Sequence, residues 1–214
     1  MSNHHTDHDD VVVGSDGVHR CRWCIVDPDY VTYHDQEWGF PQRDDTRLFE
    51  KICLEGFQAG LSWLTILRKR EQFRKVFHSF DIQKVARMTD RDVDRLLLNS
   101  GIVRHRGKIE STINNARCAL KVVESFGSFA SHVWSFAPAA NRAAPRKFGD
   151  VPAHTPESKS LSTDLKKRGF SFVGPTTMYA FMQAVGMVND HLAGCSARQA
   201  AEHERLSFDL SHGG

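Results

Sequence analysis

The chain has 214 residues, of which 40% are hydrophobic and 25% are charged, and its formal net charge at pH 7 is +2. This length allows one sizeable domain or two small ones with a substantial core. So small a net charge does not by itself indicate nucleic-acid binding, and no stretch approaches the ~18 consecutive apolar residues of a membrane span. The five cysteines are an odd number, unlike the disulfide framework of a secreted protein.

The first residues are polar, and His4-His5-Thr6-Asp7-His8-Asp9-Asp10 has no apolar core of the kind found in a signal peptide. Residues 1–18 are therefore expected to form a disordered tail, in which Val11-Val12-Val13 is a short and isolated β-like run. The absence of a targeting segment predicts a cytoplasmic protein whose cysteines stay reduced.

Helical spacing of apolar residues dominates the rest of the chain. The expected helices open near Asp45, Ser62, Asp81, Thr89, Gly107, Ser128, Ser162 and Gly174. The helix after Gly107 is expected to run to about Phe126, and residues 137–156, rich in Ala, Pro and Arg, are expected to be a loop. Strands and helices do not alternate and no segment repeats, so the predicted fold class is all-α.

A cation-rich glycine turn, Gly101-Ile102-Val103-Arg104-His105-Arg106-Gly107-Lys108, joins two of these expected helices. A helix that begins at such a turn points its unpaired N–H groups and its positive dipole end outward, where they can bind phosphate. A solvated basic turn between two core helices explains the same residues, so the turn alone leaves both interpretations open.

Possible metal ligands lie near both ends of the chain. Cys21 and His34 are near the start, and His191 and Cys195 are four residues apart near the end. A His and a Cys at this spacing project on the same side of a helical turn, which suits two ligands of one tetrahedral ion such as zinc. A buried cysteine among the 12 histidines explains the same pattern, and Cys21-x2-Cys24 is also a metal-like spacing.

Aromatic residues are concentrated between positions 23 and 63, namely Trp23, Tyr30, Tyr33, Trp38 and Trp63. Flat rings stack on flat or cationic ligands. Glu55 lies among them, followed by Gly56 and Gly60, which are unfavourable in a helix and suggest close approach of a backbone or a ligand. Rings packed in the core and a surface glutamate are the alternative explanation.

Together these segments resemble the DNA-3-methyladenine glycosylase I family, the Tag-type enzymes of the helix-hairpin-helix superfamily. The resemblance covers about residues 20–196. Its motifs are Cys21-x-Trp23, Tyr30-x2-Tyr33-His34-Asp35-x-Glu37-Trp38-Gly39, Leu54-Glu55-Gly56-x-Gln58-Ala59-Gly60-Leu61-Ser62-Trp63, Gly101-Ile102-x-Arg104-His105-Arg106-Gly107-Lys108, Lys166-Lys167-Arg168-Gly169-Phe170-x-Phe172-Val173-Gly174 and Asn189-Asp190-His191-x3-Cys195.

The resemblance implies a helix-hairpin-helix glycosylase domain over residues 19–196, followed by a C-terminal tail over residues 197–214. It implies that one structural zinc ion binds Cys21, His34, His191 and Cys195, with Cys24 outside the ligand set. It also implies a pocket for a flipped-out methylated adenine, with Glu55 as the catalytic and base-binding carboxylate and with Trp23, Tyr30, Tyr33 and Trp63 as its rings. Phe57 stands where relatives can have a polar residue, which could alter the polarity of the pocket.

The chain is accordingly expected to be a monomeric base-excision repair enzyme that hydrolyses the N-glycosidic bond of 3-methyladenine in double-stranded DNA. Methylation at N3 makes the adenine cationic and a good leaving group. A pocket of electron-rich rings and a carboxylate is suited to bind such a cationic base. The turn containing Gly101, Arg104, Arg106 and Lys108 would hold DNA phosphates, which positions the duplex without reading its sequence. Because no hairpin lysine stands out as a Schiff-base nucleophile, excision without strand cleavage is expected.

Two alternatives remain open at this point. A zinc-stapled DNA-binding protein without catalysis would need the turn and the metal but not Glu55 with its clustered rings. In addition, Phe172-Val173-Gly174-Pro175 is a second glycine turn before a helix and could be the superfamily hairpin instead. In that case Asp190 would be the aspartate to examine, since no Asp lies between Asp94 and Asp150.

Overall fold

The fold is known from a computed structural model that describes residues 10–139 and 142–209. Its helices are α1 (Pro28–Gln36), α2 (Asp45–Gln58), α3 (Trp63–Val76), α4 (Ile82–Ala86), α5 (Asp90–Leu97), α6 (Arg106–Phe126), α7 (Phe129–Trp134), α8 (Pro156–Lys167), α9 (Pro175–Ala184) and α10 (Ala197–Ser207). Short 3-10 turns span Arg22–Cys24, His78–Phe80 and Phe148–Asp150. The predicted helical fold class is confirmed, with one small sheet added to it.

That sheet is a hairpin of β1 (Val11–Val13) and β2 (His19–Cys21), paired antiparallel with Val11 opposite Cys21. The structure therefore differs from the expected disordered tail over residues 11–18, whereas residues 1–9 lie outside the described part. The hairpin closes because Gly17 takes a φ of +77° in the turn, and the Gly14 N–H donates to the Val18 carbonyl at 2.9 Å.

Most expected helix starts agree with the observed ones because the capping residues can be recognised in the sequence. The Ser62 hydroxyl accepts from the Thr65 N–H, and Thr89 forms a capping box with Asp92. Helix α6 ends at Phe126 as predicted. Helix α8 instead begins at Pro156, six residues before Ser162, because Thr155 caps it and proline suits its first turn.

The C-terminal segment is the other difference, because residues 197–207 form helix α10 where a tail was expected. Ala201 in this helix is fully buried. The Arg198 guanidinium donates to the carbonyls of Asn189 and His191, and the Asn189 amide donates to the Glu202 carboxylate at 2.9 Å. These bonds fasten α10 over the segment that contains His191.

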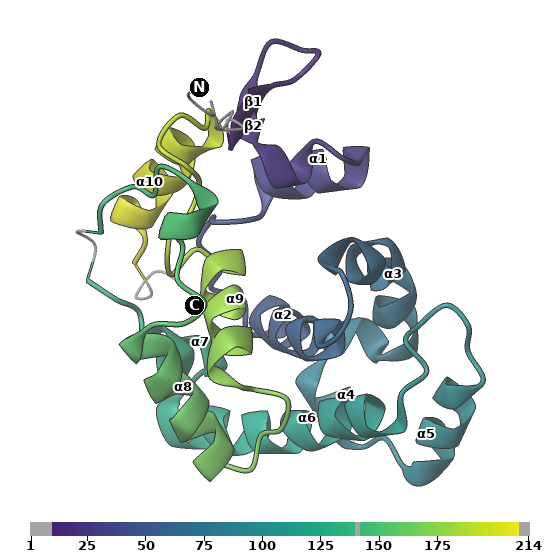
Figure 1. Cartoon of the computed structure of the whole chain (residues 1–214). Coiled ribbons are helices and arrows are strands. Elements are labelled where there is room, and N and C mark those ends of the chain that lie inside the picture. Colours follow the sequence, from purple (N-terminus) through teal and green to yellow (C-terminus); the bar gives the residue numbers. More distant parts are fainter. Residues whose placement is uncertain (1–9, 140–141, 210–214) are drawn as a thin grey trace, which may run out of the picture.

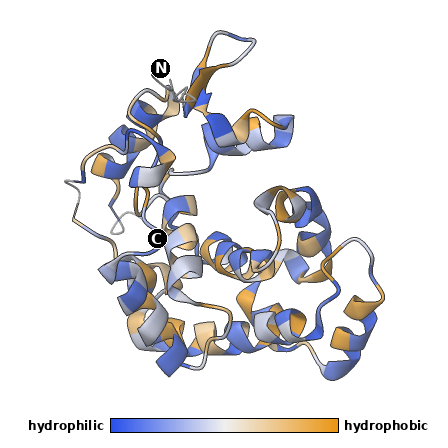
Figure 2. Cartoon of the chain, viewed as in Figure 1, coloured by the Kyte–Doolittle hydropathy of each residue, from blue (hydrophilic) through white to orange (hydrophobic). Residues whose placement is uncertain are grey.

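Helix α2 occupies the centre of the molecule, in contact with α3, α6, α7 and α9 (Figure 1). Its neighbours share a core in which the largest fully buried side chains include Phe49, Phe57, Phe73 and Phe77. Figure 2 shows polar and apolar residues following one another along the helices, as expected of amphipathic segments around one core. No helix within the described residues is long and apolar enough to cross a membrane.

The two ends of the described chain meet at one end of the molecule, where the β hairpin lies beside α10 (Figure 1). The Ser196 N–H donates to the His19 carbonyl at 2.9 Å, and Gly194 lies against Val11. This meeting brings the cysteines and histidines of both ends together.

Candidate metal centre and active site

Four buried side chains from the two ends of the chain converge on one point. Cys21 ends β2, His34 lies in the last turn of α1, and His191 and Cys195 lie between α9 and α10. Their potential ligand atoms all lie within 4.8 Å of one another. The Cys195 Sγ is 3.4 Å from His34 Nε2 and 3.6 Å from His191 Nδ1, and the two histidine nitrogens are 3.1 Å apart.

The donor–donor distances of 3.1, 3.4 and 3.6 Å are close to those of a tetrahedral zinc site. Zinc bonds of about 2.3 Å to sulfur and about 2.0 Å to nitrogen place neighbouring tetrahedral ligands roughly 3.3–3.8 Å apart. The other nitrogen of each ring is also occupied, since His34 Nδ1 lies 2.7 Å from the Asp35 carboxylate and His191 Nε2 lies 2.8 Å from the Trp38 carbonyl. Such outer partners orient histidines that bind metals. The cluster thus joins both chain ends, as predicted, and its donor set is one that zinc prefers.

Asp35 and Cys24 complete the surroundings of the cluster. Arg20 holds the Asp35 carboxylate at 2.8 Å and also pairs with Asp16, so the acid that orients His34 is itself fixed. Cys24 is fully buried in the 3-10 turn after Cys21, but it is not among the four converging donors. The resemblance likewise left Cys24 outside the ligand set.

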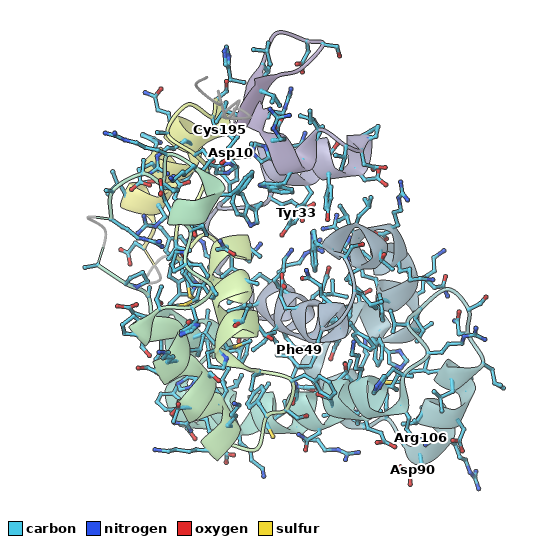
Figure 3. All side chains as sticks on the ribbon, in the orientation of Figure 1. Asp10, Tyr33, Phe49, Asp90, Arg106 and Cys195 are labelled. Atoms are coloured by element: carbon cyan, nitrogen blue, oxygen red, sulfur yellow. The ribbon has the colours of Figure 1, made fainter. Side chains whose placement is uncertain are left out.

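A second buried polar cluster lies where α1, α2 and α3 meet. Tyr33 comes from α1, Lys51 and Glu55 lie one turn apart on α2, and Trp63 opens α3. The rings of Tyr33 and Trp63 have centroids 5.4 Å apart, and the Lys51 ammonium lies over both rings. Figure 3 shows Tyr33 on the side of α1 that faces α2. All four residues are at least nine-tenths buried.

Two polar groups of this cluster lack hydrogen-bond partners. The indole N–H of Trp63 is buried and bonds to no atom of the described residues. The Glu55 carboxylate likewise forms no hydrogen bond within residues 10–139 and 142–209, and burial raises its pKa to about 7 against the opposing effect of Lys51. An unpaired buried donor costs about 1–3 kcal/mol, so a donor and a carboxylate left without hydrogen bonds in one cluster indicate a ligand site.

Two clefts reach the edge of this cluster and share Glu37 and Arg70 in their walls, and neither is lined by Glu55 or Trp63. Lys51 lines the larger, of about 630 Å³, and Tyr33 lines the smaller, of about 280 Å³.

The predicted rings fall into two linked groups. Trp23 and Tyr30 pair edge to face at 5.3 Å, and Trp23 also contacts Trp38 and the metal-cluster ring of His34. The Tyr30 hydroxyl accepts from the Leu64 N–H at 2.8 Å, immediately after Trp63. Trp23 therefore contacts both the metal cluster and Tyr30, and Tyr30 fixes the start of α3, where Trp63 lies. Phe57, considered as a possible modifier of the pocket, instead packs against Phe73 in the core, with ring centroids 4.5 Å apart and the ring planes tilted by 47°.

The basic turn before α6 forms as predicted, but its cations have different surroundings. Arg104 is exposed, and Arg106 is half-exposed and pairs with Asp94 at 2.5 Å and with Glu110 at 3.4 Å. Lys108 differs most from the expected phosphate ligand, because its ammonium is buried and donates to the carbonyls of Phe57 and Ala59 at 2.9 and 2.6 Å. Figure 3 shows Arg106 at the opposite end of the molecule from Cys195.

The second glycine turn lies against the first. Between α8 and α9, Phe172 has a φ of +56°, is 39% exposed and packs edge to face against His105 at 6.3 Å. A Cβ on Gly56 would approach Phe172 Cβ to 3.3 Å, which explains the glycine in α2. No side chain caps α9 at Gly174, whereas His105 caps α6. The start of α9 is thus the freer of the two for an anion.

Asp190, the aspartate to examine if the second turn were the hairpin, is buried, and only one of its two carboxylate oxygens is hydrogen-bonded. It accepts from the Tyr179 hydroxyl at 2.5 Å and from the Gln183 amide at 2.8 Å, and it pairs with Arg142 at 3.3 Å. Both hydrogen bonds go to Oδ2, whereas the buried Oδ1 has only the ion pair with Arg142.

The model of one protein family, described as methyladenine glycosylase, matches residues 23–199. The chain belongs to this family. DNA-3-methyladenine glycosylase 1 of Escherichia coli (strain K12) is 51% identical over 83% of this chain and 96% of its own length, and DNA-3-methyladenine glycosylase of Haemophilus influenzae is 48% identical over 84% and 97%.

Solved structures of the same family are also similar in fold. A crystal structure of 3-methyladenine DNA glycosylase I (TAG) has a TM-score of 0.78 at 52% identity and covers 83% of this chain and 98% of that one. A 3-methyladenine DNA glycosylase I from Staphylococcus aureus, solved to explain its recognition of 3-methyladenine, has a TM-score of 0.76 at 40% identity over 81% of this chain and 93% of its own. The fold therefore follows the family over most of the chain.

Proposed function

We infer that this chain is a DNA-3-methyladenine glycosylase that removes 3-methyladenine from alkylated DNA. The observation that carries the assignment is the buried cluster that contains Glu55 and Trp63, whose carboxylate and indole N–H form no hydrogen bond, in a chain 51% identical to a curated enzyme of that activity. A DNA-binding protein without catalysis needs no such cluster, so the alternative class is disfavoured.

The chemistry asks for groups that recognise a flat cation. We assign base recognition to Glu55 and to the rings of Tyr33, Trp63, Tyr30 and Trp23. Glu55 offers an anion for the positive base or an acceptor for its exocyclic amine, and the Trp63 N–H offers a donor for a ring nitrogen. When the glycosidic bond breaks, its electron pair moves to the base and neutralises it, and water adds to the sugar carbon with loss of a proton. The N3-methyl group already activates this bond, so positioning supplies much of the catalysis.

We assign zinc to the cluster of Cys21, His34, His191 and Cys195, and we assign that zinc a structural role. Four protein ligands would fill a tetrahedral ion and leave no position for water, as is usual for structural zinc. The ion would hold β2 and α1 against the segment before α10. Trp23, which contacts both His34 and Tyr30, would thereby be held in place beside the base site.

We assign DNA contact to the face formed by the two glycine turns and the turn between α2 and α3. Arg104 and the exposed Lys166 and Lys167 provide cations, and the uncapped start of α9 provides N–H groups for phosphate. Leu61, which is 42% exposed beside the base site, provides an apolar side chain for the space that a flipped base leaves. Lys108 is excluded from phosphate contact in this conformation because its ammonium is already bonded.

The decisive assay is release of free 3-methyladenine from methylated duplex DNA, with strand cleavage followed in the same reaction. Wild type is expected to release the base and leave the strand intact, and Glu55→Ala is expected to retain binding to undamaged DNA while excision falls. If wild type binds DNA but releases no base, the chain is a DNA-binding protein and the assignment fails.

A further inference from the structure

Lys51 was not among the residues that the sequence indicated, yet it lies in the middle of the base site. Its ammonium is 4.6 Å from the ring centroid of Tyr33 and 4.8 Å from that of Trp63, and it donates to the Tyr33 hydroxyl at 3.3 Å. Only 9% of the residue is exposed. A cation of the protein therefore already lies against two of the rings assigned to the base.

The charges around Lys51 are unequally paired. Arg70 grips the Glu37 carboxylate with two bonds of 2.6 and 2.8 Å, and Arg74 holds the Glu50 carboxylate at 2.7–3.0 Å. Glu55, one turn along α2, is the acid without such a partner. Burial lowers the pKa of Lys51 to about 8 against the attraction of Glu55, Glu37 and Glu50, while Arg70 lowers it further. The ammonium is thus only partly compensated.

We propose that Lys51 selects the charge of the bound base: its ammonium opposes a positive base and favours the neutral base that leaves the sugar. This step rests on the proposed function. Methylated adenine is positive while attached to the sugar and becomes neutral when the glycosidic electron pair moves onto it. A like charge within a buried site destabilises the first state and not the second. Lys51 therefore weakens binding of the intact nucleotide and speeds departure of its base.

A purely structural lysine would behave differently. It would stack on the two rings and fill space, and its replacement by an apolar side chain of similar length would affect all ligands of the same shape alike. The discriminating measurement therefore compares ligands that share a shape and differ in charge. Neutral 3-methyladenine and the permanent cation 3,9-dimethyladeninium, whose N9-methyl stands for the sugar, form such a pair.

The test measures the dissociation constants of both ligands for wild type, Lys51→Met and Lys75→Met at pH 7.5. Lys75 is an exposed lysine on α3, so its variant controls for the change in net charge. In Lys51→Met the affinity for the cation relative to the neutral base is expected to rise at least about tenfold, and Lys75→Met should match wild type. Loss of Lys51 also raises the pKa of Glu55, which would weaken cation binding, so a gain in cation preference comes from Lys51 itself.

Two further readouts make the outcome decisive. In single-turnover excision from methylated DNA, Lys51→Met should lower both the half-saturating concentration and the maximal rate. In wild type, the discrimination against the cation should shrink between pH 7.5 and pH 9 as Lys51 loses its proton, a result that needs no variant to fold. An unchanged ligand ratio in Lys51→Met with no pH effect in wild type overturns the proposal, whereas a wild type that releases no 3-methyladenine overturns the function.

Discussion

Glu55 is the residue that should control the pH dependence of excision. Burial raises its pKa to about 7, and recognition of a cationic base needs the ionised form. The pH dependence of kcat/KM reports the pKa values of essential groups in the free enzyme. The value of kcat/KM should therefore fall about tenfold per pH unit below pH 7 and level off above pH 7. Glu55→Gln should lower kcat/KM roughly 10–100-fold, because it removes a charged hydrogen bond of about 1.5–3 kcal/mol. It should also remove the decrease of kcat/KM below pH 7, the acidic limb of the profile.

The measurement is excision of 3-methyladenine from duplex DNA between pH 5.5 and pH 8.5 for both proteins. A Gln variant that keeps the same acidic limb would assign that limb to a different group.

At the same scale, the sequence indicated the rings and Glu55 but not Lys51. A lysine four residues before a glutamate on a helix usually forms an exposed pair, and nothing in the local pattern of α2 shows that α1 and α3 cover it. The unbonded Trp63 N–H was equally unpredictable, because a missing partner depends on the packing of three helices. The sequence was enough to predict which residue types take part in the chemistry. Which charges pair with one another depends on the tertiary structure and could not be predicted.

At the scale of elements, the turn before α6 separates two kinds of cation. Lys108 bonds to the carbonyls of Phe57 and Ala59, at and after the end of α2, so Lys108→Met should lower the melting temperature. Loss of two hydrogen bonds to a charged donor costs about 3–6 kcal/mol, or roughly 6–24 °C for a chain of this size.

Arg104→Ala should show the converse. It should leave the melting temperature unchanged, weaken binding to any duplex, and reduce the slope of log affinity against log salt by about one unit. Thermal melts and DNA titrations at several salt concentrations on both variants test the pair. A Lys108 variant that melts like wild type but loses the salt slope would restore Lys108 as a phosphate ligand.

The turn between α2 and α3 carries another prediction. Gly60 has a φ of +79° and Leu61 is 42% exposed, so Leu61→Ala should leave the fold and the binding of free base nearly unchanged. Excision from duplex DNA should fall, because an apolar side chain no longer fills the vacated stack. A 3-methyladenine in single-stranded DNA leaves no such gap and serves as the control substrate. Equal losses on both substrates would contradict the role.

At the scale of the whole molecule, the helix order was predictable and the ends were not. Caps such as Ser62 and Thr89 lie within a few residues of the helices they begin, so local sequence is enough to place them. The β hairpin and α10 depend on each other instead, because Val11 packs against Gly194, and Ser196, just before α10, bonds to His19 across the chain. Contacts between segments so far apart leave no periodic signal in either segment.

The metal cluster makes this meeting of the ends testable. Cys21→Ser should lower zinc content and thermal stability together, because the remaining ligands would lose the ion that holds β2 and α1 to the segment before α10. Loss of a structural metal typically costs more than about 4 kcal/mol, which corresponds to a decrease of at least about 8–16 °C here. Cys24→Ser is the matched control, a buried thiol three residues away and outside the converging donors, and should keep the metal with a small loss of stability. The measurements are zinc content by elemental analysis and thermal melts with and without chelator. A Cys21 variant that loses zinc yet melts like wild type would show that the two chain ends hold together without the ion. A Cys24 variant that loses zinc would place that thiol among the ligands.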